Sequence, residues 1–230
     1  MSNNQWDTYA DLLDERIGTG GDDLHTKLID PLIVSYAGDT SGKTVVDLGC
    51  GNGYLFGKLS PRARFIGVDG SDLLLEKAKE RTKKLESTQF ISSDISKPLP
   101  LDDHIADIVI ANMVLQYVPD LAGVCQNITR ILKKDGLCIM IIDHPGHLLF
   151  LRAQEVAGKS NNKFLDSTSY FIEGERRKKS LWDKAILTFY HRTVTSYINA
   201  FAKQFHLDQM DEVSEDGEMP RVLGLKWKKI

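Results

Sequence analysis

The stretch "VVDLGCGNGYL", from Val45 to Leu55, places three glycines at every second position directly after a hydrophobic run. Glycine has no Cβ, so these positions permit positive φ and let the backbone approach another group closely. An apolar run followed by such a loop predicts a buried strand and a tight turn into a helix. In an open α/β sheet, turns of this kind lie at the carboxyl edge, where ligands bind. We therefore expect a ligand at this turn.

The spacing of the glycines limits the class of ligand. A dinucleotide fingerprint G-x-G-x-x-G that begins at Gly49 requires glycine at position 54, where this chain has Tyr54. Twenty residues after Gly49, Asp69 ends a second apolar run, where a carboxylate can accept hydrogen bonds from both ribose hydroxyls. The pattern favours a nucleoside without phosphates. A tight turn without a ligand and a solvated aspartate at a strand end are the alternatives.

Short apolar runs alternate with stretches of helical period, which predicts parallel strands joined by crossover helices. The predicted strands of this alternating region are 44–48, 64–69, 88–92, 106–111 and 137–143. Ser71 and Asp120 are predicted helix N-caps, and Lys133, Lys134 and then Gly136 are predicted to close the second of these helices. A last helix at 193–205 and two terminal strands at 206–213 and 221–227 follow. We predict an α/β fold with a doubly wound, seven-stranded, mostly parallel sheet whose last strand is antiparallel.

These motifs together resemble the class I S-adenosylmethionine-dependent methyltransferases, and in particular their small-molecule branch with methyltransferase domain 11/25-like sequences. "VVDLGCGNGYL" is similar to the first motif of that family, "VDGS" to the second, "SSDISKPLP" to the third, "ADIVIANMVLQYV" to the fourth and "RILKKDGLCIMII" to the fifth. All five occur in the family's order over residues 44–143. The resemblance implies the Rossmann-like methyltransferase fold, S-adenosyl-L-methionine as cofactor and S-adenosyl-L-homocysteine as product.

The resemblance also implies which residues bind the cofactor. Asp69 would bind the ribose, and Asp94 and the amide of Ile95 would bind the adenine. Asn112 and Met113 would lie near the sulfonium and the substrate. The remaining cofactor-binding candidates lie against the methionine part or complete the first two motifs: Asp47, Gly49, Cys50, Gly51, Gly53, Gly70 and Ser71. Tyr9 and His25 would form a lid from the N-terminal segment.

Methyl transfer from a sulfonium needs a general base only when the acceptor arrives protonated. The candidate catalytic bases are His144, after the fifth predicted strand, and His191, before the last predicted helix. The "HP" and "YHR" at these two places are typical of a small-molecule branch of the family. His147 and Tyr190 are weaker candidates. A structural or loop role is the alternative for each histidine.

Motifs for methylating nucleic-acid bases are missing. No "[DN]PP[YFW]" follows the fourth predicted strand, and none of the three cysteines follows a proline. We therefore expect O-, N- or C-methylation of a small molecule, in a pocket shaped by residues 146–190 and the N-terminal arm. The aromatic candidates for lining this pocket are Phe150, Phe164, Tyr170, Phe171, Trp182 and Tyr190. Packing within an accessory layer is the alternative for each of them.

Composition agrees with a small-molecule enzyme. The chain has 230 residues, 42% of them hydrophobic, and a formal net charge of −3. It therefore lacks the surplus of basic residues that is typical of nucleic-acid-binding proteins, and nucleic acid is a disfavoured partner. The basic run from Arg176 to Lys179 is interpreted as a solvated loop or helix face. Three alternatives remain: a tRNA or RNA methyltransferase that uses "ERRKKSLWDK" as its phosphate contact, a non-catalytic S-adenosylmethionine-binding protein, and a nicotinamide-dependent oxidoreductase.

The remaining sequence features concern location and organisation. Three cysteines without CxxC or Cys/His spacing indicate neither a disulfide framework nor a zinc site. The N-terminus lacks the pattern of a signal peptide, and no apolar run approaches the ~18 residues of a membrane span. We expect a cytoplasmic monomer or homodimer that makes no membrane contact. The expected parts are an N-terminal helical lid (1–43), a cofactor-binding core (44–145), a substrate-side segment (146–190), and a last helix and β-hairpin that complete the same domain (191–230).

Overall fold

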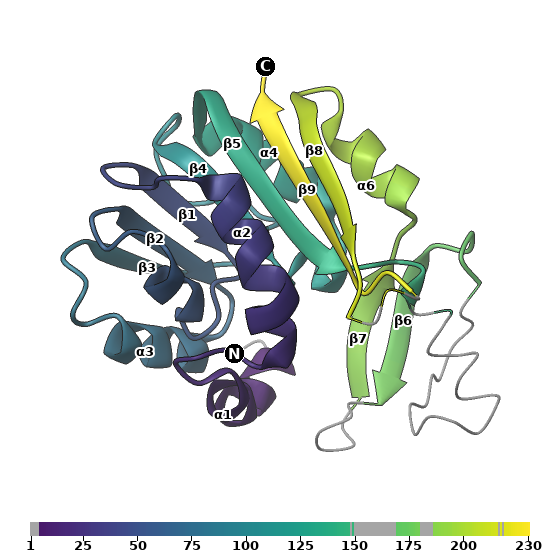
Figure 1. Ribbon diagram of the computed structural model, residues 1–230, viewed down its shortest axis with the longest axis horizontal. Helices are drawn as coiled ribbons and strands as arrows, with labels where there is room; N and C mark the ends of the chain where they lie inside the picture. The colour runs from purple at the N-terminus through teal and green to yellow at the C-terminus, as the bar shows by residue number, and fades with distance from the viewer. Residues whose placement is uncertain (1–4, 148, 150–168, 180–185, 216, 218) are drawn as a thin grey trace.

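A seven-stranded sheet organises the computed structural model, which describes residues 5–147, 149, 169–179, 186–215, 217 and 219–230 (Figure 1). The strand order is β3-β2-β1-β4-β5-β9-β8. The strands are β1 (Thr44–Leu48), β2 (Arg64–Asp69), β3 (Thr88–Ser92), β4 (Ala106–Asn112), β5 (Leu132–Asp143), β8 (Phe205–Val213) and β9 (Val222–Lys229). β1 to β5 pair in parallel, and the last strand, β9, is antiparallel to both of its neighbours, β5 and β8. The predicted fold class is confirmed.

Helices cover both faces of this sheet. They are α1 (Gln5–Ile17), η1 (His25–Ile29), α2 (Asp30–Ala37), η2 (Tyr54–Lys58), α3 (Asp72–Arg81), η3 (Leu115–Tyr117), α4 (Leu121–Ile131) and α6 (Val194–Phe201). Side chains of α4 and α6 pack with Val46 and Leu48 on one face, whereas side chains of α2 and η2 pack with Val45 on the other. Because successive strand residues point to opposite faces, a sheet covered on both sides needs such uninterrupted apolar strands.

The two predicted N-caps are confirmed. Ser71 Oγ accepts a hydrogen bond from the amide of Leu74 at the start of α3, at 3.2 Å. Asp120 Oδ1 accepts one from the amide of Gly123 at the start of α4, at 2.9 Å. Each bond satisfies an amide that has no partner within its own helix.

The predicted end of α4 is wrong. The helix ends at Ile131 and β5 begins at the next residue, so Lys133, Lys134 and Gly136 lie within the strand. Lys229 Nζ donates to the carbonyls of Thr129 and Leu132, at 2.6 and 2.7 Å, and so caps the end of α4 from the last strand.

A second, two-stranded sheet consists of β6 (Gly174–Lys179) and β7 (Ile186–His191), which pair antiparallel. This hairpin lies beside the carboxyl ends of the parallel strands, at the lower right of Figure 1. The interpretation of the basic run in β6 as a loop or helix face is therefore wrong. Pairing with β7 satisfies one edge of this strand, and the Arg176 side chain is buried and donates to the carbonyl of Ile172.

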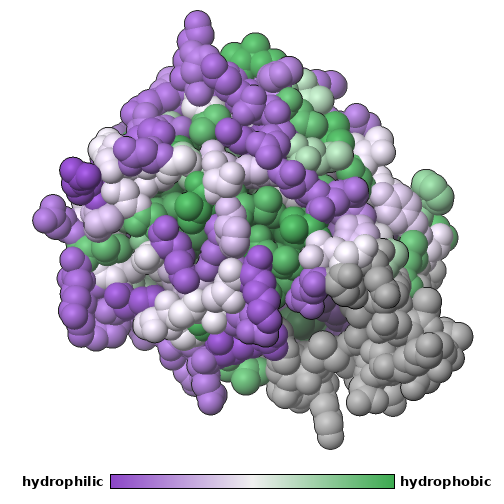
Figure 2. Space-filling model, viewed as in Figure 1, coloured by the Kyte–Doolittle hydropathy of each residue, from purple (hydrophilic) through white to green (hydrophobic). Residues whose placement is uncertain are grey.

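Hydrophilic and apolar residues are unevenly distributed on the surface. Figure 2 shows many hydrophilic residues along the left side of one face, and apolar residues gathered near its centre and at its top. In the part of the chain that the structure describes, no helix has both the length and the apolar character to cross a membrane.

Candidate active site

Backbone amides of the glycine loop between β1 and η2 donate hydrogen bonds to other groups of the protein. Gly49, Gly51 and Gly53 all have positive φ, of 75°, 52° and 70°. The amides of Gly49 and Cys50 donate to the carbonyl of Val68 at 2.7 and 3.1 Å, and the amide of Gly51 donates to Asp69 Oδ2 at 2.9 Å. These three donors are therefore occupied, although a phosphate would need such donors free. The loop suits a ligand without phosphates.

The loop also fixes Asp69 at the end of β2. Its Oδ2 accepts from Gly51, and its Oδ1 accepts from the amide of Ser71 at 2.9 Å. Burial raises the pKa of Asp69, and the bonds from backbone amides counteract part of that rise. Gly70, between Asp69 and Ser71, is exposed. The carboxylate of Asp69 is thus held in one orientation at the carboxyl edge of the sheet.

Three buried side-chain oxygens on β1, at the carboxyl end of β4 and on η3 have no hydrogen-bond partner within the described residues. They are Asp47 Oδ1 on β1, Asn112 Oδ1 at the end of β4 and Gln116 Oε1 on η3. Burial and the nearby charge of Asp69 raise the pKa of Asp47 to about 8. Buried acceptors are normally satisfied, so this cluster marks a place for a donor-bearing ligand. The ammonium of the methionine part of S-adenosylmethionine is such a donor, and the residues present fit it.

The exit of β4 is strained. Met113 has a φ of 53°, which is uncommon for a residue with a side chain, and its amide donates to the carbonyl of Ile141 at 2.7 Å. A Cβ added at Gly49 would lie 2.4 Å from Val114 Cγ2, so the glycine loop packs directly against this exit. Strained backbone that the surrounding structure holds in place clusters at functional sites. No sequence pattern predicted the conformation of Met113.

The predicted adenine-binding residues follow β3. Asp94 is exposed, and its Oδ1 accepts from the amide and the hydroxyl of Ser96 at 2.8 and 2.7 Å, which leaves Oδ2 for a ligand. Ile95 is buried, and its carbonyl accepts from Asn127 Nδ2 at 2.9 Å. Asn127 also donates to the carbonyl of Lys97 and thereby holds this loop against α4. Sequence reasoning missed the role of Asn127.

The N-terminal helix α1 contacts the cofactor side of the site. Ser71 Oγ donates to Asp7 Oδ1 at 2.5 Å, and Asn52 Nδ2 donates to Asp14 Oδ1 at 2.9 Å. Tyr9, a predicted lid residue, is buried on this helix and its ring contacts that of Trp6. α1 therefore adjoins both the glycine loop and the residues after Asp69.

The side chains of two predicted cofactor-binding residues make other contacts, and for Cys50 the prediction concerns only the backbone. His25 Nδ1 lies 2.7 Å from Asp22 Oδ1, and its ring packs edge-on against Tyr54 on η2. The Cys50 side chain is directed into the protein, since a Cβ added at Gly67 would lie 2.7 Å from its Sγ. Burial raises the pKa of the Cys50 thiol well above its ordinary value.

His144 is held by bonds to both ring nitrogens. Nδ1 accepts from the amide of Gly146 at 3.0 Å, so the proton lies on Nε2, which faces Glu212 Oε1 at 2.7 Å. No lone pair on the ring is left for a substrate proton, and the arrangement favours the structural alternative for His144. Burial and the charge of Arg221 lower the pKa of His147 to about 4.

His191, at the end of β7, has a different arrangement. Its Nε2 lies 2.8 Å from the carbonyl of Tyr170, which can only accept. The proton is therefore assigned to Nε2, and Nδ1 carries the lone pair of the ring. Phe171, which the sequence offered as a pocket residue, is 85% exposed, and Phe150, Phe164 and Trp182 lie outside the described residues.

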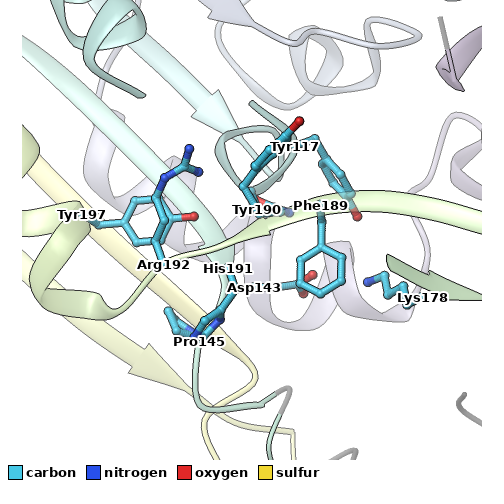
Figure 3. Close-up of a pocket in the computed structure, with 10 residues that line it drawn as sticks. Tyr117, Asp143, Pro145, Lys178, Phe189, Tyr190, His191, Arg192 and Tyr197 are labelled. Carbon is cyan, nitrogen blue, oxygen red and sulfur yellow. The ribbon is translucent and has the colours of Figure 1, made fainter. Parts of the chain in front are cut away.

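A pocket, which we name the β7 pocket, lies between η3, the end of β5 and the β6–β7 hairpin (Figure 3). Its lining residues are Gln116, Tyr117, Asp143, Pro145, Lys178, Phe189, Tyr190, His191, Arg192 and Tyr197. Of these, the sequence singled out Tyr190 and His191 as individual candidates. Arg192 follows the "YH" pair and was missed, although it donates to the carbonyls of Leu115 and Val118 at 3.2 and 2.6 Å and so fixes η3.

Comparison with known proteins agrees with the fold. The family model described as a methyltransferase domain matches residues 39–188, so the chain belongs to the methyltransferase domain family. The class I S-adenosylmethionine-dependent methyltransferase resemblance is confirmed, and S-adenosylmethionine is the cofactor of that class.

Individual proteins show the extent of the similarity. Trans-aconitate 2-methyltransferase of Enterobacter sp. (strain 638) is 33% identical over 124 residues, which are 51% of this chain and 47% of that relative. The match thus spans about half the length of the relative. The crystal structure of the PH0226 protein from Pyrococcus horikoshii OT3 has a TM-score of 0.75 at 20% identity and covers 97% of this chain and 99% of its own. The crystal structure of an S-adenosylmethionine-dependent methyltransferase from Mesorhizobium loti has a TM-score of 0.68 at 21% identity. The match covers 86% of this chain and 96% of that protein's chain. Both structures share the fold.

Proposed function

We propose that this protein transfers a methyl group from S-adenosylmethionine to an oxygen, nitrogen or carbon nucleophile of a small molecule. The observation that carries the proposal is the cluster of unpartnered buried acceptors on Asp47, Asn112 and Gln116 beside the fixed carboxylate of Asp69. Such a cluster lies at the carboxyl edge of an open α/β sheet, where the fold places ligands.

Each part of the cofactor has matching residues. Asp69 accepts hydrogen bonds from the ribose hydroxyls, and the free Oδ2 of Asp94 accepts from the adenine amino group. Asp47 attracts the ammonium of the methionine part, while the positive-φ backbone of Gly49 and Gly51 leaves room for it. S-adenosylmethionine, when bound, supplies an activated methyl group on a positively charged sulfonium.

The protein's own contribution to the reaction is alignment and exclusion of water. The β6–β7 hairpin supplies one wall of the β7 pocket, and α1 contacts that hairpin as well as the cofactor side. Where the acceptor loses a proton, Nδ1 of His191 is the group placed to take it. His144 instead ties the end of β5 to Glu212 on β8.

A small-molecule acceptor is supported by two observations. The trans-aconitate 2-methyltransferase named above has a small molecule in its name, and the β7 pocket is a side-chain-lined hollow rather than an extended basic groove. The basic run that an RNA substrate would use lies in β6, where Arg176 is buried and Lys178 lines this pocket. We extend the proposal to a cytoplasmic protein, on the composition of the chain.

Calorimetric titration with S-adenosylhomocysteine tests the proposal. We expect saturable binding by the wild type, and a dissociation constant about 100-fold higher for Asp69→Ala, because two charge-assisted hydrogen bonds to the ribose are lost. Asp72→Ala is the matched control, since Asp72 is a nearby exposed carboxylate in the first turn of α3. No saturable heat with the wild type, or equal affinity in Asp69→Ala, would contradict the proposal.

The acceptor itself requires a second experiment. A panel of metabolites incubated with the protein and S-adenosylmethionine should release S-adenosylhomocysteine with one chemical class of compound. The same assay with total tRNA tests the RNA alternative, which predicts binding that weakens steeply as the salt concentration rises.

A further inference from the structure

The β7 pocket has more positive than negative charge in its wall. Lys178 and Arg192 are the lysine and arginine that line it, and Asp143 is the carboxylate. Asp143 is already paired, because Arg221 Nη1 donates to its Oδ1. Burial opposes the ionisation of Asp143, but the charges of Arg221 and Lys178 hold its pKa below the ordinary value. Arg221 is thus the ion-pair partner of Asp143, and Lys178 acts on Asp143 through its charge without pairing with it.

Lys178 forms no ion pair with any carboxylate among the residues that the structure describes. Its Nζ lies 5.3 Å from the centre of the Phe189 ring, and Figure 3 shows the amino group directed toward that ring. A cation over an aromatic face gains about 0.5–2 kcal/mol, which is less than a paired carboxylate provides in a partly buried place. Lys178 thus keeps its donors available to a ligand.

Arg192 is held in place by neutral groups. Its guanidinium donates to the carbonyls of Leu115, Val118 and Pro119, and it lies 5.7 Å from the centre of the Tyr190 ring. Carbonyls satisfy its donors but do not cancel its formal charge. Arg192 therefore adds a fixed positive potential, whereas Lys178 offers the free donors.

Two tyrosine hydroxyls are further polar groups of the wall, while Gln116 Oε1 and His191 Nδ1 are its acceptors. Burial raises the pKa of Tyr117, and burial and the charge of Glu175 raise that of Tyr190, so both hydroxyls stay protonated at neutral pH. The Tyr190 hydroxyl is hydrogen-bonded to Glu175, whereas that of Tyr117 can donate to a ligand. Partly buried positive charge without a counter-ion is unfavourable, and an anion that enters such a site gains charge-assisted hydrogen bonds.

We propose that the β7 pocket binds the carboxylate of an organic acid, with the Lys178 ammonium as its counter-ion. The proposal rests on the proposed function, because it names the class of the methyl acceptor. Lys178 is then a specificity-determining residue that selects acids over neutral compounds of the same shape. Arg192 supports this selection through its field and by holding η3, which carries Tyr117.

The test compares acids with their neutral amides. Malonate and succinate, and malonamide and succinamide, are titrated into the S-adenosylhomocysteine complex and into the free protein at constant ionic strength, and the shift in Tm is followed. We expect a Tm increase with the acids and none with the amides. In Lys178→Met the apparent dissociation constant of the acids should rise about tenfold, the change expected for one charge-assisted hydrogen bond.

Two further variants separate charge from structure. Lys178→Arg keeps the positive charge and should retain most of the affinity. Lys203→Met removes a charge from an exposed lysine and should behave as the wild type. In the activity assay with the metabolite panel, Lys178→Met should raise KM for acids more than it lowers kcat.

The outcomes distinguish this proposal from the proposed function. Stabilisation by the amides equal to that by the acids, an unchanged acid affinity in Lys178→Met, or no response to any acid overturns the role of Lys178 while S-adenosylhomocysteine binding stands. Absence of S-adenosylhomocysteine binding would contradict the proposed function, and the acid titrations of the free protein would still decide whether Lys178 binds an anion. Unchanged S-adenosylhomocysteine affinity in Lys178→Met shows that this variant is folded.

Discussion

The side-chain amide of Gln5 forms two hydrogen bonds with the backbone of Thr188, which lies 183 residues further along the chain. Gln5 Nε2 donates to the Thr188 carbonyl at 3.3 Å, and the Thr188 amide donates to Gln5 Oε1 at 3.2 Å. The next two residues of α1 continue this contact, since Trp6 packs edge-on against Tyr117 with ring centres 4.8 Å apart and Asp7 accepts from Ser71. Three successive residues thus join the hairpin and η3 to the cofactor side.

Gln5→Ala should loosen α1 without unfolding the protein. Each hydrogen bond contributes about 1 kcal/mol net, so loss of the pair should speed amide exchange in α1 by roughly tenfold or more. Hydrogen-exchange mass spectrometry measures this. Gln89→Ala, at an exposed position on β3, is the control and should leave exchange in α1 unchanged. Equal exchange in α1 for all three proteins would show that the Gln5 pair does not hold the helix.

Asp47→Asn should change the pH dependence of stability. Folded Asp47 keeps its proton up to a pKa of about 8, whereas an unfolded chain releases it near the ordinary value of 3.8. Between these values the folded state binds more protons, so this residue lowers the free energy of unfolding as pH rises from about 4 to about 8. In Asp47→Asn the side chain does not titrate, so the free energy of unfolding does not fall with pH for this reason. Urea unfolding at pH 5 and pH 8 should show the variant gaining stability relative to the wild type at the higher pH, and a constant difference would contradict the assignment.

The same residue should couple cofactor binding to proton release. An ammonium beside Asp47 favours the ionised carboxylate, so the wild-type affinity for S-adenosylhomocysteine should rise between pH 6 and pH 8. Calorimetry in two buffers of different ionisation enthalpy would detect the released proton. Asp47→Asn should bind more weakly at pH 8 and with less proton release, which separates the charge effect from any general loss of structure.

The strands and the glycine loop were predictable because their signals are local. The apolar runs of β1, β2 and β3 match the predicted ranges residue for residue, and Ser71 and Asp120 cap their helices as expected. A buried parallel strand needs a continuous apolar run, and a cap needs an oxygen at one position. Neither depends on a residue far away in the sequence.

The incorrect predictions depend on distant contacts. α4 ends where Lys229, 98 residues beyond Ile131, donates to its last carbonyls, and no pattern near Gly136 could indicate this. The contact of His144 with Glu212 on β8 was equally unpredictable, and it favours a structural role for this histidine. The basic run of β6 has no apolar alternation and is a strand through its pairing with β7.

Glutamine replacements of the two candidate bases should affect different quantities, kcat for His191 and Tm for His144. His191→Gln removes the lone pair at Nδ1 and should lower kcat by about 100-fold or more for an acceptor that loses a proton, with little change in S-adenosylhomocysteine affinity. His144→Gln removes the contact with Glu212 and should lower Tm while kcat stays near the wild-type value. Thermal unfolding and steady-state kinetics on both variants measure this. A kcat loss confined to His144→Gln would reverse the assignment.

Tyr54 stands where a dinucleotide-binding loop has glycine, and its hydroxyl should stabilise the fold. It donates to Asp30 Oδ2, and Lys58 Nζ lies 3.3 Å from the same oxygen. Asp30 is 7% exposed, so the loss of one partner leaves a buried carboxylate with fewer bonds. Tyr54→Phe should lower the free energy of unfolding by about 1–3 kcal/mol. A double-mutant cycle with Asp30→Asn measures the coupling, and additive effects of the two substitutions would show that the pair contributes nothing of its own.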